Sequence, residues 1–256
     1  MKTIDLNCDM GESFGAWTMG QDDGVLEFVS SANIACGFHA GDPATMRRTV
    51  AAAVARGVAI GAHPSLPDLA GFGRREMRVS TDDAYAMTLY QIGALAAMAR
   101  AVGAHLAHVK PHGALYNMAA KDGVLAGAIA AAVRDFDRGL ILVGLAGSEL
   151  PRAGETVGLA VAHEAFADRR YETDGSLMPR GKTGAVINEI DTAVAQAIAI
   201  ATRGETEGPD GTIRIRADTI CVHGDRADAA LFARRLRQGL EAAGINIAAL
   251  PTGRGA

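Results

Sequence analysis

The chain has 256 residues, of which 49% are hydrophobic and 21% charged, and its formal net charge at pH 7 is -4. A chain of this length buries about three quarters of the surface that its unfolded form exposes, so its core needs no disulfide or structural metal. The acidic balance argues against a nucleic-acid partner, because proteins that bind nucleic acids are usually basic.

No segment of the sequence is expected to contact a membrane. The longest strongly apolar run lies around residues 140–145, far short of the ~20 residues that cross a bilayer. The N-terminus passes from Lys2 directly into alternating polar residues, without the apolar core of a secretory signal. Three widely spaced cysteines, Cys8, Cys36 and Cys221, fit reduced thiols better than a disulfide framework. We therefore expect a cytoplasmic protein.

Short apolar runs alternate with longer alanine-rich stretches of helical period, a pattern typical of a mainly parallel sheet covered by helices. The alternation predicts an α/β fold, a single (β/α)-barrel domain over residues 1–256 with about seven parallel strands. The predicted strands span residues 3–9, 32–38, 58–63, 105–110, 140–145, 157–164 and 219–223.

Helix starts follow several of these strands. Asp42 precedes a proline and is expected to cap a helix over residues 43–56. Ser80 opens a capping-box-like start of the next long helix. Asp225 is expected to cap the helix over residues 226–243 in the same way.

Alternation along the strands predicts which side chains enter the barrel, because residues two apart share a face. Asp5, Asn7 and Asp9 form one polar face of the first strand and should face a central cavity. Cys8 and Cys36 should then point toward the covering helices as small core residues.

The predicted strand ends are unusually polar. Five of the seven finish on an ionisable group and His39 directly follows a sixth, whereas the strand starts are mostly apolar. Five of the seven histidines, His163 among them, lie at these ends. Parallel α/β folds bind ligands at the carboxyl ends of their strands. A single histidine there is often only hydrogen-bonded, and Asp42 and Asp225 are also explained as helix caps. The convergence of many such groups on one rim favours a functional site. They are Asp9, Glu12, His39, Asp42, His63, Lys110, His112, Glu164, Asp168, His223 and Asp225.

One segment imitates a nucleotide-binding loop. Gly175, Gly181, Lys182 and Thr183 resemble a P-loop, but five residues separate the glycines where four are required, and no buried strand precedes them. No convincing nucleotide motif is therefore present. Anion binding by Arg180 and Lys182 in this loop remains open.

Six motifs lie in order over residues 5–225. They are DLNCDMGE (5–12), SANIACGFHAGDP (31–43), GAHPSLPDLAGFGRR (61–75), HVKPHGALYN (108–117), EAFADRRY (164–171) and ICVHGD (220–225). Together they resemble the LamB/YcsF family. The resemblance implies a distorted (β/α) barrel of the glycoside hydrolase/deacetylase type. It also implies one subunit of the bacterial ATP-dependent 5-oxoprolinase, which hydrolyses 5-oxo-L-proline to L-glutamate with subunits B and C.

The polar residues suit that chemistry. A five-membered lactam is a stable amide, and ATP, with Mg²⁺ expected beside it, can activate the carbonyl by phosphorylating its oxygen. Positioned acids and bases then direct water, and cations, among them Lys110, Arg74, Arg75 and Arg169, neutralise anionic charge. The candidate catalytic residues are Asp9, Glu12, His39, His63, Lys110 and His112. The candidate substrate-binding residues are Asn7, Arg74, Glu164, Asp168, Arg169, His223 and Asp225.

Two other functions remain open at this point. A self-sufficient metal-dependent deacetylase or amidohydrolase would use Asp9, His39 and His63 as ligands of a divalent metal, with water completing the shell. Alternatively, the chain is a non-catalytic subunit whose rim only holds a small acid.

Overall fold

The computed structural model describes residues 2–20, 22–222 and 228–252. Seven parallel strands form a closed barrel, in which β1 pairs with β2 on one side and with β9 on the other. The predicted barrel of about seven parallel strands is therefore confirmed. Its strands are β1 (Thr3–Met10), β2 (Ser31–Ala35), β3 (Ala59–His63), β4 (Leu106–Val109), β5 (Ile141–Leu145), β6 (Ala160–Phe166) and β9 (Thr219–Val222).

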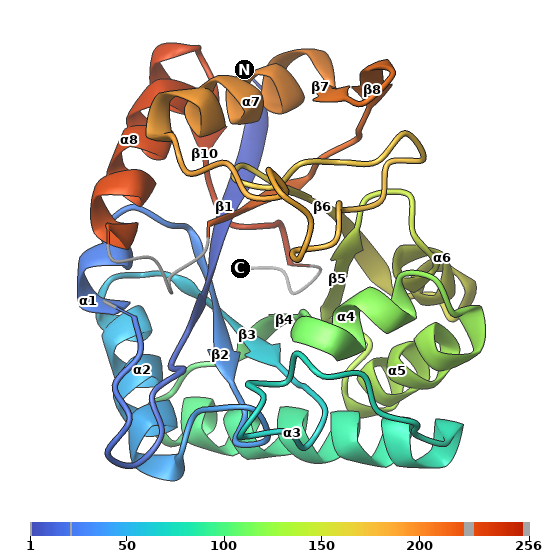
Figure 1. Ribbon diagram of the computed structural model, residues 1–256. Coiled ribbons are helices and arrows are strands. Elements are labelled where there is room, and N and C mark those ends of the chain that lie inside the picture. The colour runs from blue at the N-terminus through green and yellow to red at the C-terminus, as the bar shows by residue number, and fades with distance from the viewer. Residues whose placement is uncertain (1, 21, 223–227, 253–256) are drawn as a thin grey trace.

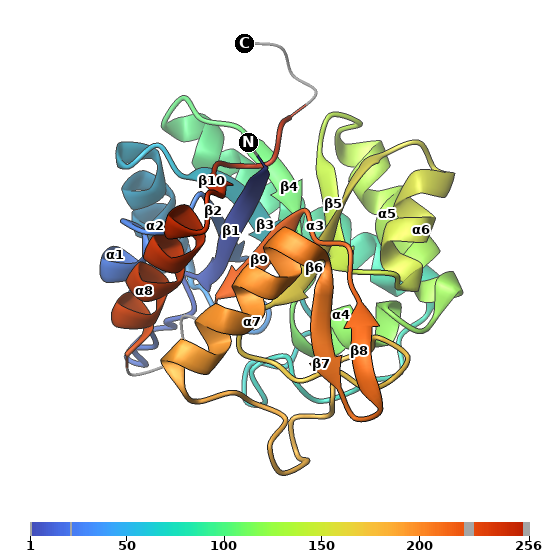
Figure 2. The same cartoon turned by 90° about the horizontal axis from the view of Figure 1, so that it is seen from above.

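Helices surround this barrel, as Figures 1 and 2 show. Within the described ranges, none of them combines the length and the apolar character needed to cross a bilayer. The cytoplasmic location stays a prediction. The helices are α1 (Asp22–Val25), α2 (Pro43–Ala55), α3 (Thr81–Ala101), α4 (Gly113–Ala119), α5 (Gly123–Phe136), α6 (Glu149–Thr156), α7 (Ile190–Arg203) and α8 (Ala229–Ala242).

Two predicted caps are present. The Asp42 carboxylate accepts hydrogen bonds from the backbone amides of Ala44 and Thr45 at the start of α2, and Ser80 accepts one from the Asp83 amide at the start of α3. Each satisfies an amide that has no partner within its helix. The side chain of Asp42 is thus used to cap an outer helix.

Two predicted element starts were wrong by three residues. The strand expected from residue 157 begins at Ala160, because Val157 ends α6 and Gly158 turns the chain with a φ of 79°. The helix expected from residue 226 begins at Ala229, and Asp228 occupies its cap position. The structure also contains an antiparallel hairpin that was not predicted, formed by β7 (Glu205–Gly208) and β8 (Gly211–Arg214), which lies beside α7 in Figure 2.

The predicted alternation on β1 is confirmed. Ile4, Leu6 and Cys8 pack into the main hydrophobic core with residues of the surrounding helices, and Cys36 joins the same core. The other face of β1 points into the barrel, where buried polar side chains replace the apolar layers that usually fill such barrels.

The amino-terminal end of the barrel is covered by the last part of the chain. The short strand β10 (Asn246–Ile247) pairs with the first residues of β1. Beyond it, Leu250 packs against Ile141, Val143 and Ala162. The polar groups inside the barrel are therefore accessible from its carboxyl-terminal end.

Candidate active site

A buried ion cluster lies inside the barrel around Lys110, which directly follows β4. Its Nζ lies 2.9 Å from Oδ1 of Asp9 on β1 and 2.8 Å from Oε1 of Glu164 on β6. It also donates a hydrogen bond to Oδ1 of Asn7 and lies 3.1 Å from Sγ of Cys221. Strand alternation explains why these side chains meet. Each occupies an inward-facing position on a barrel strand or directly after one.

The charges in this cluster stabilise one another. Burial opposes charge on Lys110, but Asp9 and Glu164 together raise its pKa well above the usual value. Burial likewise acts to raise the pKa of Asp9, but His63 and Lys110 outweigh it and hold this pKa well below its usual range. At neutral pH the cluster therefore contains a charged ammonium and a charged Asp9 carboxylate.

Asn7 and Glu164 lie behind this ion pair. The Asn7 amide donates to Glu164 and to Thr219, while its oxygen accepts from Asn33 and Lys110. Glu164 also accepts a 2.7 Å hydrogen bond from the Tyr116 hydroxyl. Because these neighbours occupy their hydrogen-bonding capacity, both residues are placed to orient Lys110.

Three histidines and one carboxylate form a second cluster beside Asp9. One ligand atom from each of Glu12, His39, His63 and His112 lies within 4.8 Å of the others, and all four residues are buried. Oε1 of Glu12 lies 3.5 Å from both His39 Nε2 and His112 Nδ1. The ring of His39 stacks on that of His112 with centroids 3.9 Å apart. These four side chains are a set that could hold a metal ion.

The two stacked rings are neutral near pH 7. Burial lowers the pKa of His39 and of His112 well below the usual value, and their mutual proximity adds to the effect for His39. A neutral imidazole is able to accept a proton or to bind a metal. Oδ2 of Asp9 lies 3.3 Å from His63 Nε2. The histidine cluster and Asp9 therefore place several proton-accepting groups side by side.

A cavity of ≈ 810 Å³ opens onto both clusters. Asp9, His63, Lys110 and His112 line it from the barrel side. All six candidate catalytic residues are thus brought together at the carboxyl ends of β1 to β4.

The cavity rim carries arginines. Arg74 is exposed at the rim, with its guanidinium 4.9 Å from the centroid of the Phe72 ring. Arg169 is largely buried, and Nη2 donates a hydrogen bond to the Met178 carbonyl. Burial, with the nearby charge of Arg180, lowers the pKa of Arg169 to about 10, so the group stays cationic at neutral pH. An anionic ligand would therefore meet positive charge at the entrance.

Three other residues predicted for the site or for anion binding do not line this cavity. Arg75 pairs with Asp68 rather than facing the cavity rim, and Lys182 pairs with Glu172. Asp168 is buried beside Arg169 and acts on its charge. His223 and Asp225, which were predicted to bind substrate, lie outside the described residues.

Three further polar residues contact the site but were not predicted to belong to it. Asn33 donates to both Asn7 and Asp9, and His108 Nε2 lies 2.6 Å from the Asn33 oxygen. Strand alternation could have identified both. Tyr116 lies on helix α4, so no strand pattern could have placed it against Glu164.

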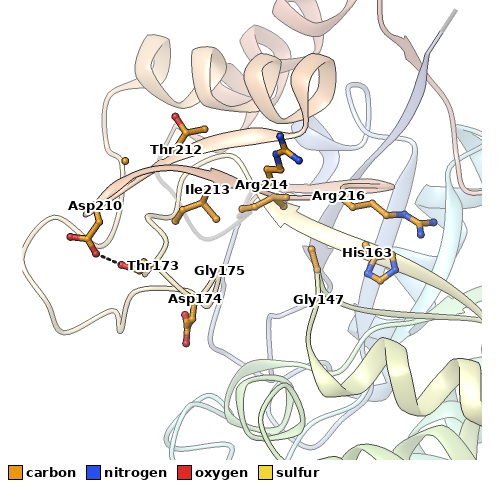
Figure 3. Close-up of a pocket in the computed structure, with 13 residues that line it drawn as sticks. Gly147, His163, Thr173, Asp174, Gly175, Asp210, Thr212, Ile213, Arg214 and Arg216 are labelled. Atoms are coloured by element: carbon orange, nitrogen blue, oxygen red, sulfur yellow. Dashed lines mark hydrogen bonds between the residues drawn. The ribbon is translucent and has the colours of Figure 1, made fainter.

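A second cavity of ≈ 620 Å³ lies outside the barrel, between β6 and the hairpin (Figure 3). It is lined by His163, Arg214 and Arg216 among others, and a hydrogen bond joins Thr173 to Asp210 at its edge. His163 was expected among the rim residues. Because Glu164 points into the barrel, the preceding His163 must point away from it.

The sequence is similar to known proteins over nearly its whole length. The profile of the LamB/YcsF family matches residues 4–254. The chain belongs to the LamB/YcsF family. Two relatives are named as the A subunit of 5-oxoprolinase. The one from Methylococcus capsulatus is 63% identical over 97% of this chain and 96% of its own length, and the one from Bacillus subtilis is 56% identical over 98% of each.

Solved structures agree with this membership. The lactam utilization protein of Thermus thermophilus is similar with a TM-score of 0.93 and 47% identity, over 98% of this chain and 100% of that one. A family 4 carbohydrate esterase from Streptomyces lividans has a TM-score of 0.51 at 12% identity, over 99% of this chain and 95% of that one. That second likeness shows only that this LamB/YcsF chain shares its fold with the esterase.

Proposed function

We propose that this chain is the barrel subunit of an ATP-dependent 5-oxoprolinase, a hydrolase that opens the lactam of 5-oxo-L-proline to give L-glutamate. The observation that carries the proposal is the 63% identity, over nearly the whole of both chains, to a protein named as the A subunit of 5-oxoprolinase.

The geometry suits ring opening of a small anionic amide. The substrate carries a carboxylate, which the positive rim of Arg74 and Arg169 would attract. The carbonyl oxygen would take the phosphoryl group of ATP, which leaves ADP. Water would then attack the carbonyl carbon, the C–N bond would break, and the nitrogen would take up a proton. A second water would release phosphate from the resulting acyl phosphate. Lys110 would neutralise negative charge on the transferred phosphoryl group. Asp9 and the neutral histidines would accept the proton of the water.

The reaction as a whole needs more than this chain. The sequence holds no convincing nucleotide-binding motif, and Lys182 of the P-loop-like segment pairs with Glu172. We therefore assign ATP binding, with Mg²⁺, to the complex, and we propose that two further subunits, B and C, take part. The compartment proposed for the complex is the cytoplasm.

The test is reconstitution. The purified chain, with ATP, Mg²⁺ and 5-oxo-L-proline, should release little phosphate and form little glutamate. Addition of subunits B and C should produce both in equal amounts. If the chain alone released phosphate and formed glutamate in equal amounts and at a high rate, the assignment of ATP binding to the partners would be contradicted.

A second function is favoured by the cluster of Glu12, His39, His63 and His112. Such a set suits a metal-dependent amide hydrolase that needs neither ATP nor partners. Hydrolysis of an amide or acetyl ester by the isolated chain, stimulated by a divalent metal and unaffected by ATP, would support this second function over the first.

A further inference from the structure

The hydrogen bonds of two histidines leave an electrostatic conflict inside the second cluster. Nδ1 of His63 lies 2.7 Å from the backbone carbonyl of Lys110, and Nε2 of His112 lies 2.9 Å from the carbonyl of Phe72. A carbonyl only accepts hydrogen bonds, so each of these nitrogens carries the hydrogen. When both rings are neutral, the remaining nitrogens, His63 Nε2 and His112 Nδ1, therefore present bare lone pairs. A hydrogen on His63 Nε2 would instead face Asp9 Oδ2, 3.3 Å away, or His112.

These two lone pairs face each other. His63 Nε2 and His112 Nδ1 are only 2.9 Å apart, and Oε1 of Glu12 lies 3.5 Å from the same His112 nitrogen. Two imidazole lone pairs and a carboxylate oxygen repel one another unless a positive centre lies between them.

The neighbouring ring of His39 adds an unsatisfied donor group. His39 is 1% exposed, and among the residues that the structure describes neither of its ring nitrogens has a hydrogen-bond partner. Its Nε2 lies 3.5 Å from Oε1 of Glu12. A buried polar side chain that lacks a hydrogen bond costs about 1–3 kcal/mol, so this ring indicates a ligand that supplies the missing interaction.

We propose that Glu12, His39, His63 and His112 bind one divalent transition-metal ion of the Zn²⁺ class. Imidazole nitrogens with one carboxylate are the donors that such ions prefer. Bonds of about 2.05 Å in a tetrahedral site place neighbouring ligand atoms about 3.3 Å apart. The distances of 2.9, 3.5 and 3.5 Å found here need only small side-chain shifts.

The surroundings of the two histidines fit the same assignment. Metal-binding histidines usually donate their other ring hydrogen to a carbonyl or carboxylate, which fixes the tautomer. His63 and His112 do so to the Lys110 and Phe72 carbonyls. Both rings also line the ≈ 810 Å³ cavity, so the ion would be reachable from solvent.

This ligand set differs from the one that the sequence suggested. Asp9 was expected as a ligand with His39 and His63, but its Oδ1 is occupied by Lys110 and Asn33. Glu12 and His112 complete the set instead. The inference goes beyond the proposed 5-oxoprolinase function and does not depend on it, because it concerns ion binding by the isolated chain.

The test measures binding without substrate or ATP. The chain is treated with a chelator, and Zn²⁺ and Co²⁺ are then titrated in by calorimetry, with the visible spectrum recorded for Co²⁺. We expect one ion per chain, a rise in Tm on binding, and the strong visible bands of Co²⁺ in a site of low coordination number. Glu12→Gln and His39→Asn should each weaken binding at least ~100-fold, as loss of a direct ligand exceeds the 10–100-fold cost of losing a supporting residue.

His163→Asn is the matched control, because His163 lines the other cavity and its loss should leave the affinity unchanged. The Tm of each metal-free variant shows whether it is folded, and the wild-type titration needs no variant at all. The inference is overturned if the wild-type chain binds no ion. It is also overturned if Glu12→Gln and His39→Asn bind as tightly as wild type, or if ¹⁵N NMR shows a proton shared between His63 and His112 that Zn²⁺ does not displace.

Discussion

Nζ of Lys110 lies 2.9 Å from Oδ1 of Asp9, although 101 positions separate the two residues in the sequence. Asp9 lies on β1 and Lys110 directly follows β4, and these two strands are not neighbours in the sheet, so the ion pair spans the interior of the barrel. The same ammonium contacts Glu164 at 2.8 Å. One cation therefore links three separate parts of the barrel and balances two carboxylates that have little access to water.

Lys110→Met should lower the free energy of unfolding by about 3–5 kcal/mol at neutral pH, because it leaves two carboxylates without their cation. The loss should shrink at mildly acidic pH. Without the ammonium, the pKa of one carboxylate rises in the folded state, so folding takes up a proton and is favoured as the pH falls. Urea unfolding at several pH values measures both effects. An equal loss of stability at all pH values would contradict this explanation.

The hydroxyl of Tyr116 donates a 2.7 Å hydrogen bond to Oε2 of Glu164 in the interior. Tyr116→Phe should lower the free energy of unfolding by about 1–3 kcal/mol, because a buried acceptor loses its donor. Tyr85→Phe is the matched control, since the Tyr85 hydroxyl contacts Asp135 at an exposed position. Urea unfolding should show a clear loss for the first variant and little change for the second.

Gly61 on β3 leaves space for the ring of His108. A Cβ at this position would overlap that ring, so Gly61→Ala must displace His108 from Asn33 and should cost roughly 1–3 kcal/mol, as overpacking does. The matched control is Gly93→Ala in the middle of α3, where nothing lies within 4 Å of the added atom. That change should raise the Tm slightly, because alanine favours a helix over glycine. Equal effects would contradict the assigned packing.

Asp42 should contribute to stability through the start of α2. Hydrogen bonds from Gly15, Thr45 and Ala44 lower the pKa of its carboxyl to about 2. Because the pKa is lower in the folded state, this stabilisation is fully present above the usual pKa near 3.9 and is lost as the pH falls through about 2. Asp42→Ala should lower the Tm by a few degrees at neutral pH, and thermal melts at low pH should show a smaller difference.

Much of the barrel follows from patterns in the sequence, because a strand of alternating polarity has only one face that suits an apolar surrounding. Asp5, Asn7 and Asp9 could be placed inside for that reason, and Cys8 outside. The same alternation was not applied to His163, which directly precedes the inward-facing Glu164 and so points outward.

The finer arrangement of the site depends on contacts that no local pattern contains. Glu12 and His112 meet only because the segments after β1 and β4 turn back over the barrel, bringing residues 100 positions apart within 3.5 Å. Tyr116 reaches Glu164 from a helix. Asn7 was predicted to bind substrate, but no pattern in the sequence could show that its side-chain amide hydrogen-bonds four protein groups.

The most direct test of the account is the effect of Asp9→Asn on glutamate formation from 5-oxo-L-proline by the chain reconstituted with subunits B and C. The substitution keeps the size of the side chain but removes the charge beside Lys110 and His63. We expect kcat/KM to fall at least ~100-fold, equivalent to about 2.7 kcal/mol of transition-state stabilisation. His163→Asn, in the other cavity, should stay close to wild type. An Asp9→Asn complex that assembles and retains activity within a few fold of wild type would contradict the assignment of catalysis to the carboxyl end of this barrel.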